Sequence, residues 1–176
     1  MSRVLVIGLA LSAVTGLAQA QASYDCLKGP LAASTEVKQG LHRGLADLVA
    51  ETAPDHAELA QLAADWQVGA SELRHHRVRH LSAVEPARLP DANAVRSFAW
   101  DDEDEIVLAA KDPAYAALAE HVAALEAESR NHPGWSGLRA VVRERLSDTA
   151  EYKALLQDAG VKAGAVNADL AACFAG

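Results

Sequence analysis

The sequence predicts an all-α protein of six to seven short helices, packed as a bundle or an orthogonal array, with its termini joined by a disulfide bond. Apolar residues recur at intervals of three and four residues over most of the chain, which is the period of an amphipathic helix. Capping residues and turn signals divide these stretches into segments with short connections. Hydrophobic residues make up 51% of the chain, enough for several helices to bury one face each against a common core.

Residues 1–22 have the organisation of a secretory signal peptide. Arg3 precedes an apolar run from Val4 to Leu17, and two overlapping cleavage sites with small residues follow the run. The run spans about 14 residues, fewer than the roughly 20 that a membrane-spanning helix needs. We therefore expect cleavage, a periplasmic or secreted location, no integral membrane segment after cleavage, and a single α-helical domain over residues 23–176. The alternative is a retained, buried N-terminal helix.

The protein is acidic. It has 24 acidic and 16 basic residues, a net charge of −8, and loss of Arg3 with the signal peptide leaves 15 basic residues and a net charge of −9. Phosphate contacts need a surplus of lysine and arginine, so this charge argues against a nucleic-acid partner. It also gives no reason to expect an anionic membrane surface as a partner.

The two cysteines, Cys26 and Cys173, lie near the two ends of the expected mature chain. In an exported protein this pair favours one disulfide bond between the termini. The closed loop would contain nearly the whole domain, which corresponds to about 5 kcal/mol of stabilisation in the chain-entropy model. Two independent thiols are the alternative.

Capping residues divide the first half of the chain into an irregular start and three helices. Gly29 and Pro30 are expected to delay the first helix until residue 34 or 35. Gly69 is expected to end the second helix as its C-cap, before Ser71 begins the third. The three helices are expected over residues 34–53, 54–69 and 71–85.

Residues 88–105 do not show a single clear period. Asp91 can cap a short helical turn, and Trp100 is followed by the acidic run 101–105 and then by an apolar run. Two structures fit this pattern: a small hairpin, or an acidic loop that leads into a helix. The acidic run lacks the glycine and glutamate positions of an EF-hand calcium loop, so a solvated turn is expected.

The stretch from Asp112 to Arg130 gives the clearest helical pattern. Asp112 is a good N-cap, Pro113 suits the first helical position, and apolar residues follow at spacings of three and four. Alanine occupies most positions between them, which allows neighbouring helices to approach closely. We expect this helix at the centre of the fold.

Two further helices are expected after a turn at residues 131–134. The first contains Leu138 and Leu146 on its apolar face, and the second begins with a capping box of Asp148 and Glu151 and ends at Gly160. A last short apolar segment, residues 165–174, is expected to fold back and bring the second cysteine near the first.

One histidine-rich segment points to metal chemistry. Glu72, His76 and His80 are spaced by four residues, so they share one helix face, and imidazoles at i and i+4 can chelate zinc or copper. A further ligand could come from His42, His56, His121 or His132, and His121 is favoured because it lies on the helix expected at the centre of the fold. The alternative is that His76 and His80 border the core and hydrogen-bond to neighbouring acids or carbonyls.

Three arginines surround these histidines and suggest ion pairs rather than an anion site. Arg74, Arg77 and Arg79 do not share one helix face, so they do not form a fork for one anion. We expect them to pair with the acidic run 101–105.

The three tryptophans fall near expected helix ends. Trp66, Trp100 and Trp135 are expected to close gaps between helices at these positions. A ligand pocket lined by two of them is the alternative, since pockets in helical proteins lie between packed helices.

The common short enzyme and cofactor motifs are missing. The chain has no haem attachment motif, no His-Glu-x-x-His zinc motif, no nucleophile elbow and no phosphate-binding glycine loop, so we assign no catalytic residue and no cofactor. We expect an exported α-helical protein, not an enzyme, that binds a protein or small-molecule ligand of unknown identity. The alternative function is metal binding or sensing through the His76 and His80 pair.

Overall fold

The computed structural model describes residues 22–175, so the expected signal peptide lies outside the described residues. The predicted all-α fold is confirmed, with seven α-helices and no strand over residues 22–175. The helices are α1 (Tyr24–Thr52), α2 (Ala57–Val84), α3 (Ala92–Ser97), α4 (Asp102–Lys111), α5 (Pro113–Arg130), α6 (Trp135–Val141) and α7 (Ala150–Ala172). Single 3-10 turns, Pro54–His56 and Pro86–Arg88, connect α1 to α2 and α2 to α3, and a π-helical stretch, η3 (Val142–Leu146), continues α6.

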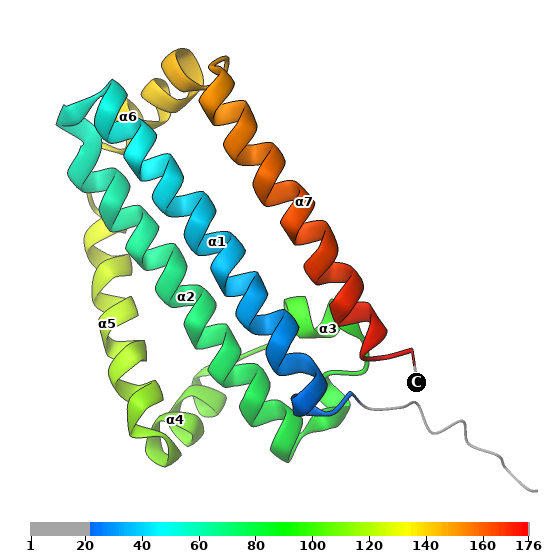
Figure 1. Cartoon of the computed structure of the whole chain (residues 1–176). Helices are drawn as coiled ribbons and strands as arrows, with labels where there is room; N and C mark the ends of the chain where they lie inside the picture. Colours follow the sequence, from blue (N-terminus) through cyan, green and yellow to red (C-terminus); the bar gives the residue numbers. More distant parts are fainter. Residues whose placement is uncertain (1–21, 176) are drawn as a thin grey trace, which may run out of the picture.

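The four long helices lie side by side in the order α7, α1, α2, α5 (Figure 1). Helix α1 contacts α2 and α7, and α2 contacts α5. The expectation that residues 112–130 form the central helix is therefore wrong, because α5 lies at one edge of the row. Its N-cap was predicted correctly, since the Asp112 side chain accepts hydrogen bonds from the first backbone amides of α5.

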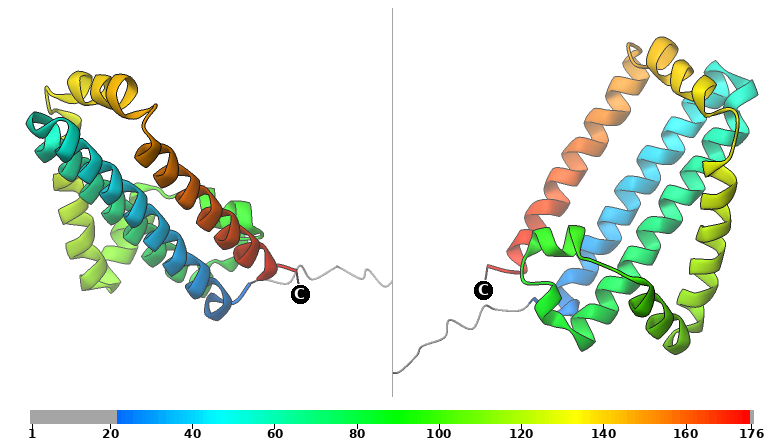
Figure 2. Two further views of the ribbon diagram at one scale, coloured as in Figure 1. Left: turned by 45° about the horizontal axis from the view of Figure 1, so that its top comes forward. Right: turned by 180° about the vertical axis from the view of Figure 1, so that it is seen from behind.

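One side of α1 and α2, here called the inner face, is covered by short helices at both ends. At one end Val49 belongs to a buried cluster with Leu138 of α6. At the other end Leu31 and Val78 are buried with Val95 of α3. Figure 2 shows α6 and α3 crossing the row on this same side, in the view from behind. The middle of the inner face lies between these two covers.

Helix α1 begins ten residues earlier than the sequence predicts. Ser23 caps its first turn, and Pro30 lies inside the helix rather than before it. An interior proline costs a helix about 3 kcal/mol. Burial of Leu27 and Leu31, which are 0% and 7% exposed, offsets this cost, because each buried leucine stabilises the fold by about 1.5–3 kcal/mol.

Helix α2 is continuous through Gly69, so the predicted C-cap at this residue is wrong. Ser71 does not begin a new helix, since its hydroxyl donates to the Gln67 carbonyl one turn earlier in α2. The glycine is explained by packing: a Cβ at position 69 would lie 2.6 Å from Val122 Cγ2 of α5. Gly44 serves α7 in the same way, with Leu155 2.8 Å from the position of its absent Cβ. The two helices at the edges of the row, α5 and α7, thus each approach their neighbour, α2 or α1, at a glycine.

Alanine substitutions at two helical glycines are expected to have opposite effects. Gly160→Ala should raise the free energy of unfolding by about 0.5–1 kcal/mol, because nothing lies within 4 Å of its Cβ position and alanine favours the helix. Gly69→Ala should lower it by about 1 kcal/mol or more, since overpacking of the Val122 contact outweighs the helix gain. Urea unfolding of both variants checks this. Equal stabilisation by both would contradict the close packing of α5 on α2.

The acidic run 101–105 begins a helix, which decides between the two structures that the sequence left open. Asp101 and Asp104 form a capping box at the start of α4, and the other acids of the first turn interact favourably with the helix dipole. Helix α7 is capped by Thr149 rather than by the predicted Asp148. It also continues through Gly160 to Ala172, so the predicted separate segment 165–174 is wrong.

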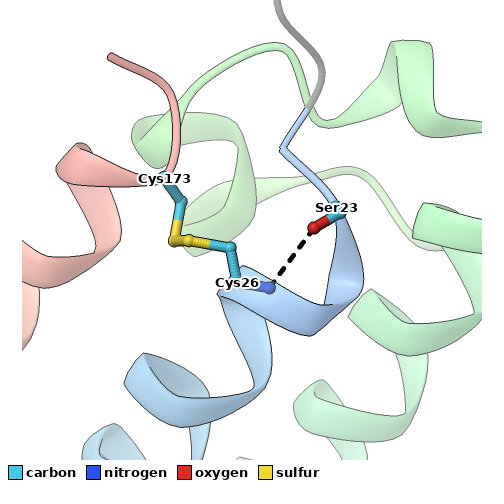
Figure 3. The surroundings of a disulfide bond; sticks show 3 residues. All are labelled: Ser23, Cys26 and Cys173. Carbon is cyan, nitrogen blue, oxygen red and sulfur yellow. Dashed lines mark hydrogen bonds between the residues drawn. A yellow bond between two sulfur atoms is a disulfide. The ribbon is translucent and has the colours of Figure 1, made fainter. Parts of the chain in front are cut away.

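The end of α7 meets the start of α1 at the predicted disulfide bond. Cys26 and Cys173 are bonded, with their Cα atoms 5.8 Å apart, beside the Ser23 cap of α1 (Figure 3). Leu170 of α7 is buried in the same cluster as Leu27 of α1. Among the helices of residues 22–175, none combines the length and the apolar character needed to cross a membrane.

Candidate functional site

A cavity of about 510 Å³ opens on the inner face beneath α6 and η3. Alanines of α1 and α2 form its floor, and their small side chains leave the space that larger residues of α6, η3 and α7 surround. The volume lies within the range of pockets that bind small molecules. The lining residues are His42, Leu45, Ala46, Val49, Ala60, Ala63, Ala64, Trp66, Gln67, Trp135, Leu138, Arg139, Val142, Arg143, Ser147 and Tyr152.

Two of the three tryptophans line this cavity. Trp66 comes from the middle of α2, and Trp135 is the first residue of α6. The Trp135 indole donates a hydrogen bond to the Ser129 carbonyl at the end of α5, which fixes the ring against the turn between α5 and α6. This arrangement matches the alternative interpretation of the sequence, in which two tryptophans line a pocket between helices. The third, Trp100, packs elsewhere, beside α2 and α4.

A few polar groups interrupt the apolar lining. The polar side chains of His42, Gln67, Tyr152 and Arg139 belong to the cavity lining. The His42 pKa is lowered, first by burial of the imidazole and then by the charge of Lys38, which favours the neutral ring. A neutral imidazole can both donate and accept a hydrogen bond. Convergent polar groups of this kind orient a bound molecule in an otherwise apolar pocket.

The sequence favours His42 only as a candidate metal ligand, and it gives no signal for Tyr152 or Arg139 as binding residues. Each comes from a different helix, and no short spacing connects them. The only available signal was the pair of tryptophans, since large rings near small residues indicate a cavity between helices.

The structure separates the four residues of the predicted metal site. Glu72 and His76 line a groove of about 390 Å³ on the outer face, the side of α1 and α2 opposite the inner face. His76 Nδ1 lies 3.3 Å from an Asp112 oxygen. The His80 ring instead meets the Trp100 ring edge-on, and His121 is exposed on α5.

Among residues 22–175, no three His, Cys, Asp or Glu side chains converge to hold a metal ion. Neither His76 nor His80 lines the cavity on the inner face. Metal binding by Glu72, His76, His80 and His121 stays a prediction, which calorimetric titration with zinc and copper would test.

The expected pairing of arginines with the acidic run is confirmed for one of them. Glu105 accepts hydrogen bonds from Arg77, Trp100 and Tyr115 at a single carboxylate oxygen. The Arg77 guanidinium lies 5.2 Å from the Trp100 ring centroid and 5.9 Å from that of Tyr115. Arg79 pairs with Asp112, whereas Arg74 donates to backbone carbonyls at the end of α3. This network fastens α4 and α5 to α2.

Tyr115 is the most perturbed group of the network. Its side chain is fully buried, and burial together with the hydrogen bond to Glu105 raises its pKa to about 12. A phenol that ionises so late stays neutral near pH 7 and is a poor base or nucleophile. The network is therefore structural.

We expect Tyr115→Phe to remove the highest-pH step of the tyrosinate absorbance titration. The folded pKa is raised, so this residue contributes stability below about pH 10 that is lost as the pH rises toward about 12. Glu105→Gln should move the same step to lower pH, because the Glu105 charge and hydrogen bond help to raise the pKa. Circular dichroism recorded in parallel checks that the protein is folded. An unchanged highest step in Tyr115→Phe would contradict the assignment.

Comparisons of the chain with protein-family models, with curated proteins and with solved structures gave no match. We therefore infer a function from the cavity and its lining residues.

Proposed function

We propose that this protein binds a small, largely apolar molecule in the cavity on its inner face. The observation that carries the proposal is a space of about 510 Å³ walled by Trp66, Trp135 and Tyr152 and floored by alanines. Apolar surface gains about 25 cal/mol for each Å² removed from water, so a ring system that fills this space gains several kcal/mol. The indoles add stacking surfaces for an aromatic ligand.

The cavity walls are held in place before any ligand arrives. Val49 and Leu146 are 0% and 1% exposed, so the helices around the space are anchored in the core. Ser147 continues the η3 backbone and donates its hydroxyl to the Arg143 carbonyl. A preformed site avoids the cost of ordering side chains on binding, which favours affinity.

Export of the protein is part of the proposal. The disulfide between Cys26 and Cys173 supports it, because such bonds persist in oxidising compartments and are rare in the cytosol. The expected signal peptide in residues 1–22 supports it as well. A binding protein in the periplasm or outside the cell would meet its ligand there.

The neutral fluorescent probe N-phenyl-1-naphthylamine tests the binding function. It should bind the native protein with one site and a Kd of about 200 µM or tighter, from roughly 0.3 kcal/mol for each of its heavy atoms. Ala63→Phe places a ring in the cavity and should weaken binding tenfold or more. Ala154→Phe is the control, since this alanine is exposed on α7 and does not line the cavity.

Comparison of the two variants distinguishes binding in the cavity from nonspecific binding to the protein surface. Equal binding by wild type and Ala63→Phe would contradict the proposal, as would the absence of saturable binding. Circular dichroism spectra of both variants should match wild type, because a partly unfolded protein also binds such probes.

A further inference from the structure

We propose that the ligand of this cavity is an amphipathic anion, whose apolar part lies against the indoles and whose acidic group binds Arg139 and Arg143. This inference deepens the proposed function and rests on it. The charges around the cavity carry it, because its lining contains two arginines and a histidine but no aspartate or glutamate. That selection is notable in a chain with 24 acidic and 16 basic residues.

Arg139 is the principal contact for the acidic group. It lines the cavity from α6, next to the apolar Leu138, and the ion pairs described among residues 22–175 join Glu126 and Glu144 to other arginines. Most of the other arginines and lysines in residues 22–175 pair with a carboxylate or donate to a backbone carbonyl. The planar guanidinium presents paired donors that match a carboxylate, a sulfonate or a phosphate, and such charge-assisted bonds are about twice as strong as neutral ones.

Arg143 adds a second positive charge one turn further along. It also lines the cavity, and among residues 22–175 it pairs with the adjacent Glu144. Both members of that pair are exposed, with 72% and 62% of their side-chain surfaces accessible. An exposed ion pair contributes little, so the Arg143 guanidinium can turn to a ligand at low cost.

The inner face beyond the cavity is basic as well. His42 lines the cavity, and Lys38 lies one helical turn before it on α1. Burial first and then the charge of Lys38 lower the His42 pKa, and burial first and then the charge of Arg74 lower the Lys38 pKa, so each of these charges lies near the next group. Arg74 donates to the backbone carbonyls of Val95 and Arg96 rather than to a carboxylate. The charges of Lys38 and Arg74 would attract an anion toward the cavity opening, where the neutral His42 ring can donate a hydrogen bond to it.

The test compares two probes that differ by one acidic group. Anilinonaphthalene sulfonate carries a sulfonate, and N-phenyl-1-naphthylamine has the same ring system without it. In the double variant Arg139→Gln/Arg143→Gln, the sulfonate probe should bind tenfold or more weakly, whereas the neutral probe should change less than twofold. Arg43→Gln is the control, because it removes one charge from exposed surface of α1 away from the cavity lining.

Salt gives an independent readout of the same contact. Binding of the sulfonate probe to wild type should weaken severalfold between low ionic strength and 0.5 M sodium chloride, and binding of the neutral probe should not. Equal weakening of both probes in the double variant, or an unchanged sulfonate affinity, would overturn the anion proposal while the apolar binding function stands. Failure of both probes to bind wild type would overturn the binding function itself and the anion proposal with it.

Discussion

Reduction of the Cys26–Cys173 bond is expected to lower the free energy of unfolding by about 5 kcal/mol, the largest single effect on this fold. The bond joins residues 147 positions apart, so it restricts nearly the whole unfolded chain. It also connects the end of α7 to the start of α1, where Leu27 and Leu170 share a buried cluster. A loss of this size corresponds to a melting temperature lower by about 10 °C or more.

Thermal and urea unfolding with and without reductant measure this effect. The variant Cys26→Ser/Cys173→Ser should match the reduced wild type, and reductant should not change its stability further. A change of less than about 1 kcal/mol on reduction would show that restricting the unfolded chain adds little net stability. It would contradict the stabilising role of the disulfide, although not the fold.

Val122→Asp is expected to lower the free energy of unfolding by about 4 kcal/mol or more. Val122 is 4% exposed, and its Cγ2 atom fills the space beside Gly69 of α2. A carboxylate there would be buried without a partner. Because domains of this size have a total stability of about 5–15 kcal/mol, the variant should be largely unfolded under mild conditions.

The neighbouring residue provides the matched control. His121→Asp introduces the same charge one position earlier on α5, at an exposed site, and should change stability by no more than about 0.5 kcal/mol. Urea unfolding of both variants gives the comparison. Equal effects, or a larger effect at position 121, would mean that α5 presents a different face to α2.

The helices themselves could be predicted from the sequence because their causes are local. Asp112 and Pro113 mark the start of α5, and the period of apolar residues marks its buried side. The disulfide is also predictable from the sequence, since two cysteines in one chain allow a single intramolecular pairing.

Several helix boundaries could not be predicted, because tertiary contacts decide them. Gly69 was interpreted as a helix end, but it is needed for the close approach of α5. Pro30 was expected to precede α1, but burial of Leu27 and Leu31 carries the helix past it. The order of the helices in the row could not be predicted either, since no local sequence pattern places α5 at its edge.

The candidate site was less predictable than the fold. The histidine spacing predicts a metal site at His76 and His80. In the structure His76 contacts Asp112, and the His80 ring packs edge-on against the Trp100 ring. The cavity is assembled from residues of α1, α2, α6 and α7 that no sequence spacing connects. Only the tryptophans gave a sequence signal for it.

The indole N–H resonances of the three tryptophans test the central claim most directly. In a nitrogen-15 spectrum titrated with N-phenyl-1-naphthylamine, the Trp66 and Trp135 signals should shift and saturate together, since both rings line the cavity. The Trp100 signal should stay in place, because its indole donates to Glu105 at 2.7 Å, outside the cavity. Single Trp→Phe variants assign the three signals. A shift of Trp100 alone or to the same extent, or no shift in any indole, would contradict the claim that the inner-face cavity binds a small apolar ligand.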